Sequence, residues 1–226
     1  MLPGLAPSPI ESLVPVTATY CGTAVSGTDT TALTFTGVAI DDGFIVVAVM
    51  HDDVGSGNNS APIAVTVGGV PCWMLATTAS PAVNAQVNTT FWMSDAPLSG
   101  ATANIEVDFA NTSDKCRVNT YVLSGPAIVY ASGATPGDTS ATIAGATVPA
   151  GGALIVACGV NDGSETPSIT TSGITMTNDQ NGNSQSMGTR SQHFNNTGAA
   201  VAGISFTHGT QGTIKNLLYM SLQGVD

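Results

Sequence analysis

Short apolar runs and alternating segments recur along this 226-residue chain. Residues 44–50 and 154–158 are continuous apolar runs rich in β-branched side chains, which is typical of strands covered on both faces. Residues 105–109 instead alternate with a period of two, so their apolar side chains should face a core while Glu106 and Asp108 face water. Both patterns predict strands.

Turn-forming residues separate these segments at intervals of about 8–12 residues. Residues 65–71 read as a strand, a Gly-Gly turn and a second strand, which is a hairpin signature. Short strands at this spacing predict an all-β fold, an antiparallel β-sandwich of the jelly-roll or immunoglobulin-like type.

The sequence also repeats itself in tandem. The matching pairs of segments are Gly43–Asp53 with Gly152–Asp162, Ile105–Phe109 with Ala202–Phe206, and Tyr121–Gly125 with Met220–Gly224. We therefore expect one repeat over residues 17–125 and a second over residues 126–226. A period of this length indicates a duplicated domain or two stacked units of one larger sandwich.

Residues 1–16 stand apart as an extended, proline-rich N-terminal arm. The arm is either a disordered start or a tether that lies along a neighbouring subunit. In the second case its apolar side chains would be the partner contacts, namely Leu2, Leu5, Ile10 and Leu13.

Charge excludes two classes of partner. Four basic residues stand against 15 acidic ones, a formal charge of −11, so we expect neither nucleic acid nor an anionic membrane to be bound. No apolar run is long enough to cross a bilayer, and the N-terminus lacks the basic start of a secretory signal. We expect assembly in the cytoplasm and reduced, buried thiols at all four cysteines, Cys21, Cys72, Cys116 and Cys158.

One position offers candidate metal chemistry. Asp52 and Asp53 follow the first apolar strand, and carboxylates at a strand end can bind Ca²⁺. The calcium-loop pattern is absent, however, and Asp is also a common turn residue. We expect a turn and no metal or other cofactor.

Catalytic motifs are missing. His51, His193 and His208 lie in different segments, and none accompanies a known hydrolase motif. Cys116 lies between two basic residues, but strand alternation turns it to the opposite face, toward a core. We expect no catalytic residues and no enzyme.

Binding of a glycan is the remaining small-molecule possibility. Trp73, Asn181 and Asn183 are the candidate contacts, because sugar-binding faces combine aromatic rings with Asn and Asp side chains. Trp92 is expected in the core. The polar segment 178–196 is expected to be the longest loop.

With strand runs such as those at 44–49, 65–71 and 121–125, the chain resembles the small β-sandwich virion surface proteins of tailed bacteriophages. The resemblance covers residues 17–224 and implies a structural role, with other virion proteins (the major capsid protein or tail proteins) as partners and a homo-oligomeric state. It implies localisation in the virion.

Three functions follow in order. We expect first a capsid decoration protein of the cement or head-fibre type, anchored by the N-terminal arm. The alternative is a tail-fibre or tail-tip receptor-binding protein that contacts host surface glycans. A bacterial carbohydrate-binding adhesin module is the third.

Overall fold

The computed structural model describes residues 14–27, 30–52, 61–78, 87–113, 115–138, 141–160, 167–184, 187–209 and 215–225. These residues form antiparallel strands joined by turns and contain no helix. The predicted all-β sandwich is therefore confirmed. No described helix is long and apolar enough to span a membrane.

Sixteen strands are described, eight in each half of the chain. The strands of the first half are β1 (Ala18–Ser26), β2 (Thr30–Ala39), β3 (Phe44–Asp52), β4 (Ala64–Val67), β5 (Val70–Thr77), β6 (Val87–Ser94), β7 (Thr102–Ser113) and β8 (Lys115–Leu123). Those of the second half are β9 (Ala127–Asp138), β10 (Ala141–Val148), β11 (Ala153–Val160), β12 (Ser168–Ser172), β13 (Thr177–Ser184), β14 (Met187–Asn195), β15 (Val201–Gly209) and β16 (Lys215–Gly224).

Both halves pair their strands in the same order. The first half runs β1-β8-β3-β6-β5 and β4-β7-β2, and the second runs β9-β16-β11-β14-β13 and β12-β15-β10. In each half the first strand pairs with the eighth, the eighth with the third, the third with the sixth, and the second with the seventh. This is the order of a jelly roll, in which two Greek keys close a sandwich.

The two halves differ in the pairing of their fifth strand. In the second half, β13 pairs with β14 alone. In the first half β5 pairs with β6 and also with β4, so that all eight strands form one bent sheet. The β4–β5 connection is the predicted hairpin. Its turn residues Gly68 and Gly69 have φ values of 58° and 79°, which is the conformation that a tight two-residue hairpin turn requires.

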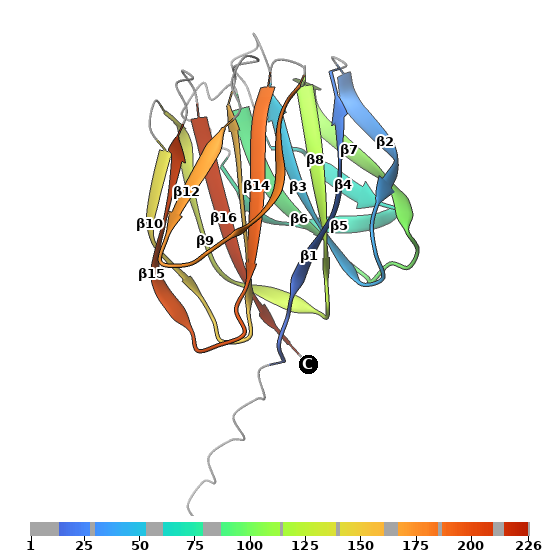
Figure 1. The fold of residues 1–226 in the computed structure, drawn as a ribbon. Coiled ribbons are helices and arrows are strands. Elements are labelled where there is room, and N and C mark those ends of the chain that lie inside the picture. Colours follow the sequence, from blue (N-terminus) through green and yellow to red (C-terminus); the bar gives the residue numbers. More distant parts are fainter. Residues whose placement is uncertain are drawn as a thin grey trace, which may run out of the picture.

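The two sandwiches pack face to face through β1-β8-β3-β6-β5 and β13-β14-β11-β16-β9 (Figure 1). We call the buried layer between these sheets the seam. On β3, Val46, Ala48 and Met50 point into the seam, whereas Ile45 and Val49 point into the first sandwich. The apolar runs are therefore covered on both faces, as their patterns predicted.

Each sandwich also has its own core. In the first, Ile105 and Val107 of β7 are buried, whereas Glu106 is exposed, as the alternation predicted. In the second, Ile204 and Phe206 of β15 take the inward positions. In the sequence match these two residues align with Val107 and Phe109, which are buried in β7, whereas Ala202, which aligns with Ile105, is exposed.

Residues 178–196 are not a loop. They form most of β13 and β14, which pair as a hairpin, so the loop prediction is wrong. Their polar side chains misled the prediction because several of them, including Thr189, Ser191 and Gln192, are buried within the assembly of sheets.

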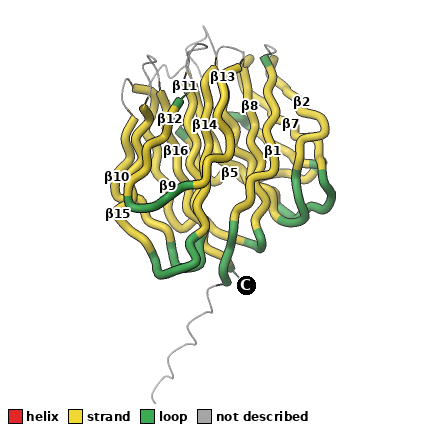
Figure 2. The backbone as a smooth tube through the Cα atoms, in the orientation of Figure 1, coloured by secondary structure: helices red, strands yellow, loops and turns green. Residues whose placement is uncertain are grey.

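The described part of the chain begins within the expected arm. Val16 is 1% exposed and packs in the seam, and its N–H donates to the Gly151 carbonyl at 2.8 Å. Val14 lies against Gly224, so both ends of the described chain meet at one pole (Figure 1). Figure 2 shows many of the described turns at this same pole. The four predicted partner contacts, Leu2, Leu5, Ile10 and Leu13, lie outside the described residues.

Candidate functional site

Three side chains from three strands meet at one edge of the seam. The Asp179 carboxylate accepts a hydrogen bond from the Tyr121 hydroxyl at 3.1 Å, and its other oxygen lies 2.6 Å from Nδ1 of His193. The side chains of Asp179 and His193 are only 2% and 14% exposed. Because Tyr121 belongs to β8 and the other two residues to β13 and β14, the cluster links the two sandwiches.

A bulge in β13 places Asp179 in this cluster. Asn178 pairs with Gln192 and Gln180 with Ser191, so Asp179 is the extra residue between two consecutive partners. A bulge re-aims one side chain without ending the strand. The bulge thereby directs the Asp179 carboxylate to this edge of the seam.

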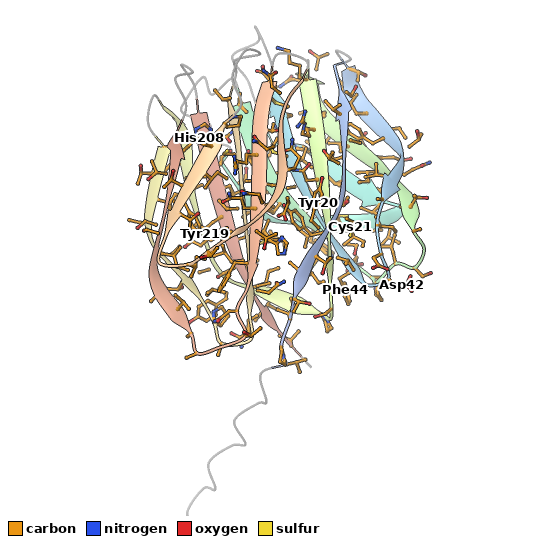
Figure 3. All side chains as sticks on the ribbon, in the orientation of Figure 1. Tyr20, Cys21, Asp42, Phe44, His208 and Tyr219 are labelled. Carbon is orange, nitrogen blue, oxygen red and sulfur yellow. The ribbon has the colours of Figure 1, made fainter. Side chains whose placement is uncertain are left out.

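Aromatic rings surround the carboxylate. Tyr20 of β1 packs edge-on to Tyr121 with ring centroids 5.6 Å apart, and Tyr121 packs edge-on to His193 at 6.3 Å. Figure 3 labels Tyr20 beside the seam on β1. Burial raises the pKa of both tyrosines, and the negative charge of Asp179 raises the pKa of each further. Both phenols therefore stay protonated at neutral pH, and that of Tyr121 donates to Asp179.

A second polar group extends the cluster along the same hairpin. Asn178 accepts hydrogen bonds from Arg190 at 2.5 Å and from Gln192. Arg117 of β8 reaches across the seam to Gly182, and its Nη1 atom lies 2.8 Å from the place that a Cβ atom of residue 182 would take. Desolvation lowers the pKa of Arg117. The hydrogen bonds of Asn178 thus join β13 to β14, while Arg117 brings a guanidinium group of the first sandwich against β13.

Of the two metal candidates, the structure describes Asp52 alone. Asp52 is buried in the seam, with its Oδ2 atom 3.5 Å from the Lys115 ammonium group, and Asp53 lies outside the described residues. Across the described part of the chain, no three His, Cys, Asp or Glu side chains gather where they could hold a metal ion.

The glycan candidates lie apart. Trp73 on β5 is 65% exposed and donates its Nε1–H to Asp95 at 2.8 Å. Asn181 and Asn183 are exposed on β13. Because β5 lies against β9 and β13 lies against β1, these residues occupy opposite edges of the seam and do not form one surface. Trp92 is buried, as predicted.

The cysteines are free, and two of them are fully buried. Cys116 lies in the core of the first sandwich, directly opposite His51, and burial raises its pKa and that of Cys158. Cys21 and Cys72 are only partly buried, and burial raises the pKa of Cys72 to about 12. All four thiols are therefore held in the protonated, weakly nucleophilic form.

His51 of β3 and Cys116 of β8 lie opposite each other in the register of the two strands. Burial lowers the pKa of His51 to about 3 while it raises that of the thiol, so both groups are neutral at pH 7. His208 is buried on β15 of the second sandwich (Figure 3), whereas His193 lies on β14 at the seam. The histidines therefore lie in three different environments.

Sequence reasoning missed the Tyr121–Asp179–His193 cluster. The three residues are scattered through the chain, and only the packing of β8 against β14 and the bulge in β13 bring them together. Their spacing carried no signal of this contact.

Comparison of the chain with protein-family models, curated proteins and solved structures finds no match.

Proposed function

We propose that this chain is a non-enzymatic structural protein of a tailed-phage virion, a capsid decoration protein anchored by its N-terminal residues. The observation that supports the proposal most is the jelly-roll strand order in both halves. Double-sheet jelly rolls recur in viral capsid and lectin domains. This support is an analogy between folds, since a fold does not by itself define a function.

The attachment of the N-terminus also fits an anchoring role. Val16 is buried in the seam and hydrogen-bonded to Gly151, so the chain that precedes it is rooted in the core of the molecule. A force on residues 1–13 would reach both sandwiches at once. A component of an assembled particle needs such a rigid connection between its anchor and its body.

Trp73 favours the second candidate, a tail protein that binds host glycans. Its indole N–H is held by Asp95, and the side chain is 65% exposed. A fixed, exposed aromatic face is suited to stacking on a sugar ring. A bacterial adhesin would use the same surface.

The copy number per virion tests the proposal. Quantitative mass spectrometry of purified particles would compare this protein with the major capsid protein. Copies on the order of hundreds support decoration, whereas a small number set by the symmetry of a tail supports the receptor-binding alternative. Absence from the particles would contradict both virion functions.

Two variants separate the anchor from the glycan surface. Replacement of Leu2, Leu5, Ile10 and Leu13 by Ser should abolish binding to particles that lack the protein, while Trp73→Ala should leave it intact. If the tail or adhesin function holds, Trp73→Ala should abolish binding on a glycan array, whereas the Ser-substituted arm variant should still bind. A Ser-substituted protein that still decorates particles would refute the anchor.

A further inference from the structure

Four large apolar side chains are exposed on two strands that lie against each other. On β5, Trp73 is 65% and Met74 47% exposed; on β9, Ile128 is 53% and Tyr130 51% exposed. We call these four residues the β5/β9 edge. It joins the two sandwiches on the side of the seam opposite the Tyr121–Asp179–His193 cluster.

The pairing of both strands is irregular beside this edge. The register of β5 shifts between Met74 and Ala76, and that of β9 shifts beside Tyr130. A bulge breaks the alternation that would otherwise turn every second side chain inward. The extra residue in β5 is Leu75, which packs against the seam, and the two residues before it, Trp73 and Met74, are both exposed.

A segment that binds the β5/β9 edge must fit aromatic rings that lie beside the edge strand of a sheet. Among the described strands β9 pairs with β16 alone. Proline-rich segments in the polyproline conformation dock on aromatic-lined surfaces, because they lose little conformational entropy on binding. Residues 1–13 of this chain have that composition, with Pro3, Pro7 and Pro9 between apolar residues.

The root of this segment lies beside the edge. Val14 packs against Gly224, which pairs with Ala127, the residue before Ile128. Tyr130 lies about 10 Å farther along the strand from Ala127. Thirteen residues in the polyproline conformation span about 40 Å, so the segment can reach all four side chains.

We propose that residues 1–13 dock on the β5/β9 edge of their own molecule in the free protein. A tethered segment has an effective concentration in the millimolar range at a site that it can reach, which favours its own chain over a second copy. The inference concerns the free protein and does not depend on the virion function.

Trp73 reports on docking directly. The chain has two tryptophans, and Trp92→Phe leaves Trp73 as the only one in an otherwise full-length protein. In this background, replacement of Leu2, Leu5, Ile10 and Leu13 by Ser should increase acrylamide quenching of Trp73 and shift its emission to longer wavelength. Ile128→Ser should do the same, because it damages the other side of the contact.

Ile63→Ser is the matched control, since Ile63 is 64% exposed but lies outside the edge. It should leave Trp73 quenching unchanged. A synthetic peptide of residues 1–13 should restore protection to the Ser-substituted arm variant. Circular dichroism and the melting temperature check that every variant is folded.

Two results would overturn the proposal. One is equal quenching of Trp73 with and without the apolar residues of the segment. The other is protection that increases with protein concentration, together with a dimer in light scattering that the arm substitutions dissociate. The second result would assign the edge to a second copy.

Discussion

Asn216 on β16 joins both sandwiches with a single amide group. Its Oδ1 accepts hydrogen bonds from the Thr89 hydroxyl and the Gly159 N–H, and its Nδ2 donates to the Val87 carbonyl, each at 2.8 Å. Asn216 is completely buried. Because water cannot replace the amide there, each lost partner leaves a buried polar group unsatisfied.

Asn216→Ala should therefore lower the free energy of unfolding by about 3 kcal/mol. Urea denaturation measures the change. Asn183→Ala is the matched control, because Asn183 is exposed on β13 and its loss should alter stability by less than about 0.5 kcal/mol. Equal effects of the two substitutions would show that the buried amide does not stabilise the seam.

His51 makes stability depend on pH. Its ring is 1% exposed and packs on Phe109 at 4.8 Å, and among the described residues neither ring nitrogen has a hydrogen-bond partner. Burial lowers its pKa from 6.5 to about 3. Between these values the unfolded chain binds a proton that the folded chain does not, so stability falls as the pH falls.

The free energy of unfolding should thus lose about 3 kcal/mol between pH 7 and pH 4 through His51 alone. His51→Leu should remove this contribution and leave the smaller slope of the other groups. Urea titrations of both proteins at the two pH values measure the difference. Parallel pH profiles would contradict a neutral, buried imidazole.

At the scale of elements, the bulge in β13 decides how the two sandwiches meet at one edge. Asp179 leaves the regular ladder there and accepts hydrogen bonds from β8 and β14. Charge-assisted hydrogen bonds of this kind are stronger than neutral ones. The bulge therefore attaches the polar edge strand β13 to β8 of the first sandwich.

Asp179→Asn should lower the pKa of Tyr20, because it removes a negative charge that raises this pKa, and should destabilise the fold by about 1–2 kcal/mol. Ultraviolet absorbance during alkaline titration follows the phenols. Tyr20→Phe identifies the contribution of Tyr20, since the transition assigned to it should disappear. An unchanged titration would show that the charge of Asp179 does not influence the pKa of the tyrosines.

Elements whose side chains alternate by polarity, or are wholly apolar, could be predicted from sequence. This holds for the apolar runs of β3 and β11 and for the alternating β7, because burial alone determines which of their side chains are apolar. The segment of β13 and β14 could not, because its Thr189 and Ser191 are buried as hydrogen-bonding groups. Polarity then no longer reports exposure.

Prediction of site residues was limited for a related reason. Asp52 was read as a turn or metal ligand at a strand end, but it lies inside the seam beside Lys115. The seam forms only after two sheets pack, and no local pattern encodes which faces meet. Trp73 is exposed, but its separation from Asn181 depends on the same packing.

For the whole molecule, we expect the seam to make the two sandwiches one folding unit. Its second-half side includes the apolar side chains Ala153, Ile155, Met187, Leu218, Met220 and Leu222. An isolated second half would present these side chains to water as a contiguous apolar surface.

Residues 126–226 expressed alone should therefore self-associate or aggregate, while the full chain should melt in a single calorimetric transition. Size-exclusion chromatography with light scattering and scanning calorimetry measure the two properties. A soluble, monomeric second half with its own melting transition would show that the seam is dispensable.

The meeting of Val14 and Gly224 at one pole has a mechanical consequence. A load applied between the two ends acts across the strands rather than along them. The hydrogen bonds that join β1 to β8 and β16 to β9 would be loaded one after another from that pole. The hydrogen bonds should therefore break in sequence at low force. The same ladders would resist a shearing load along the strands.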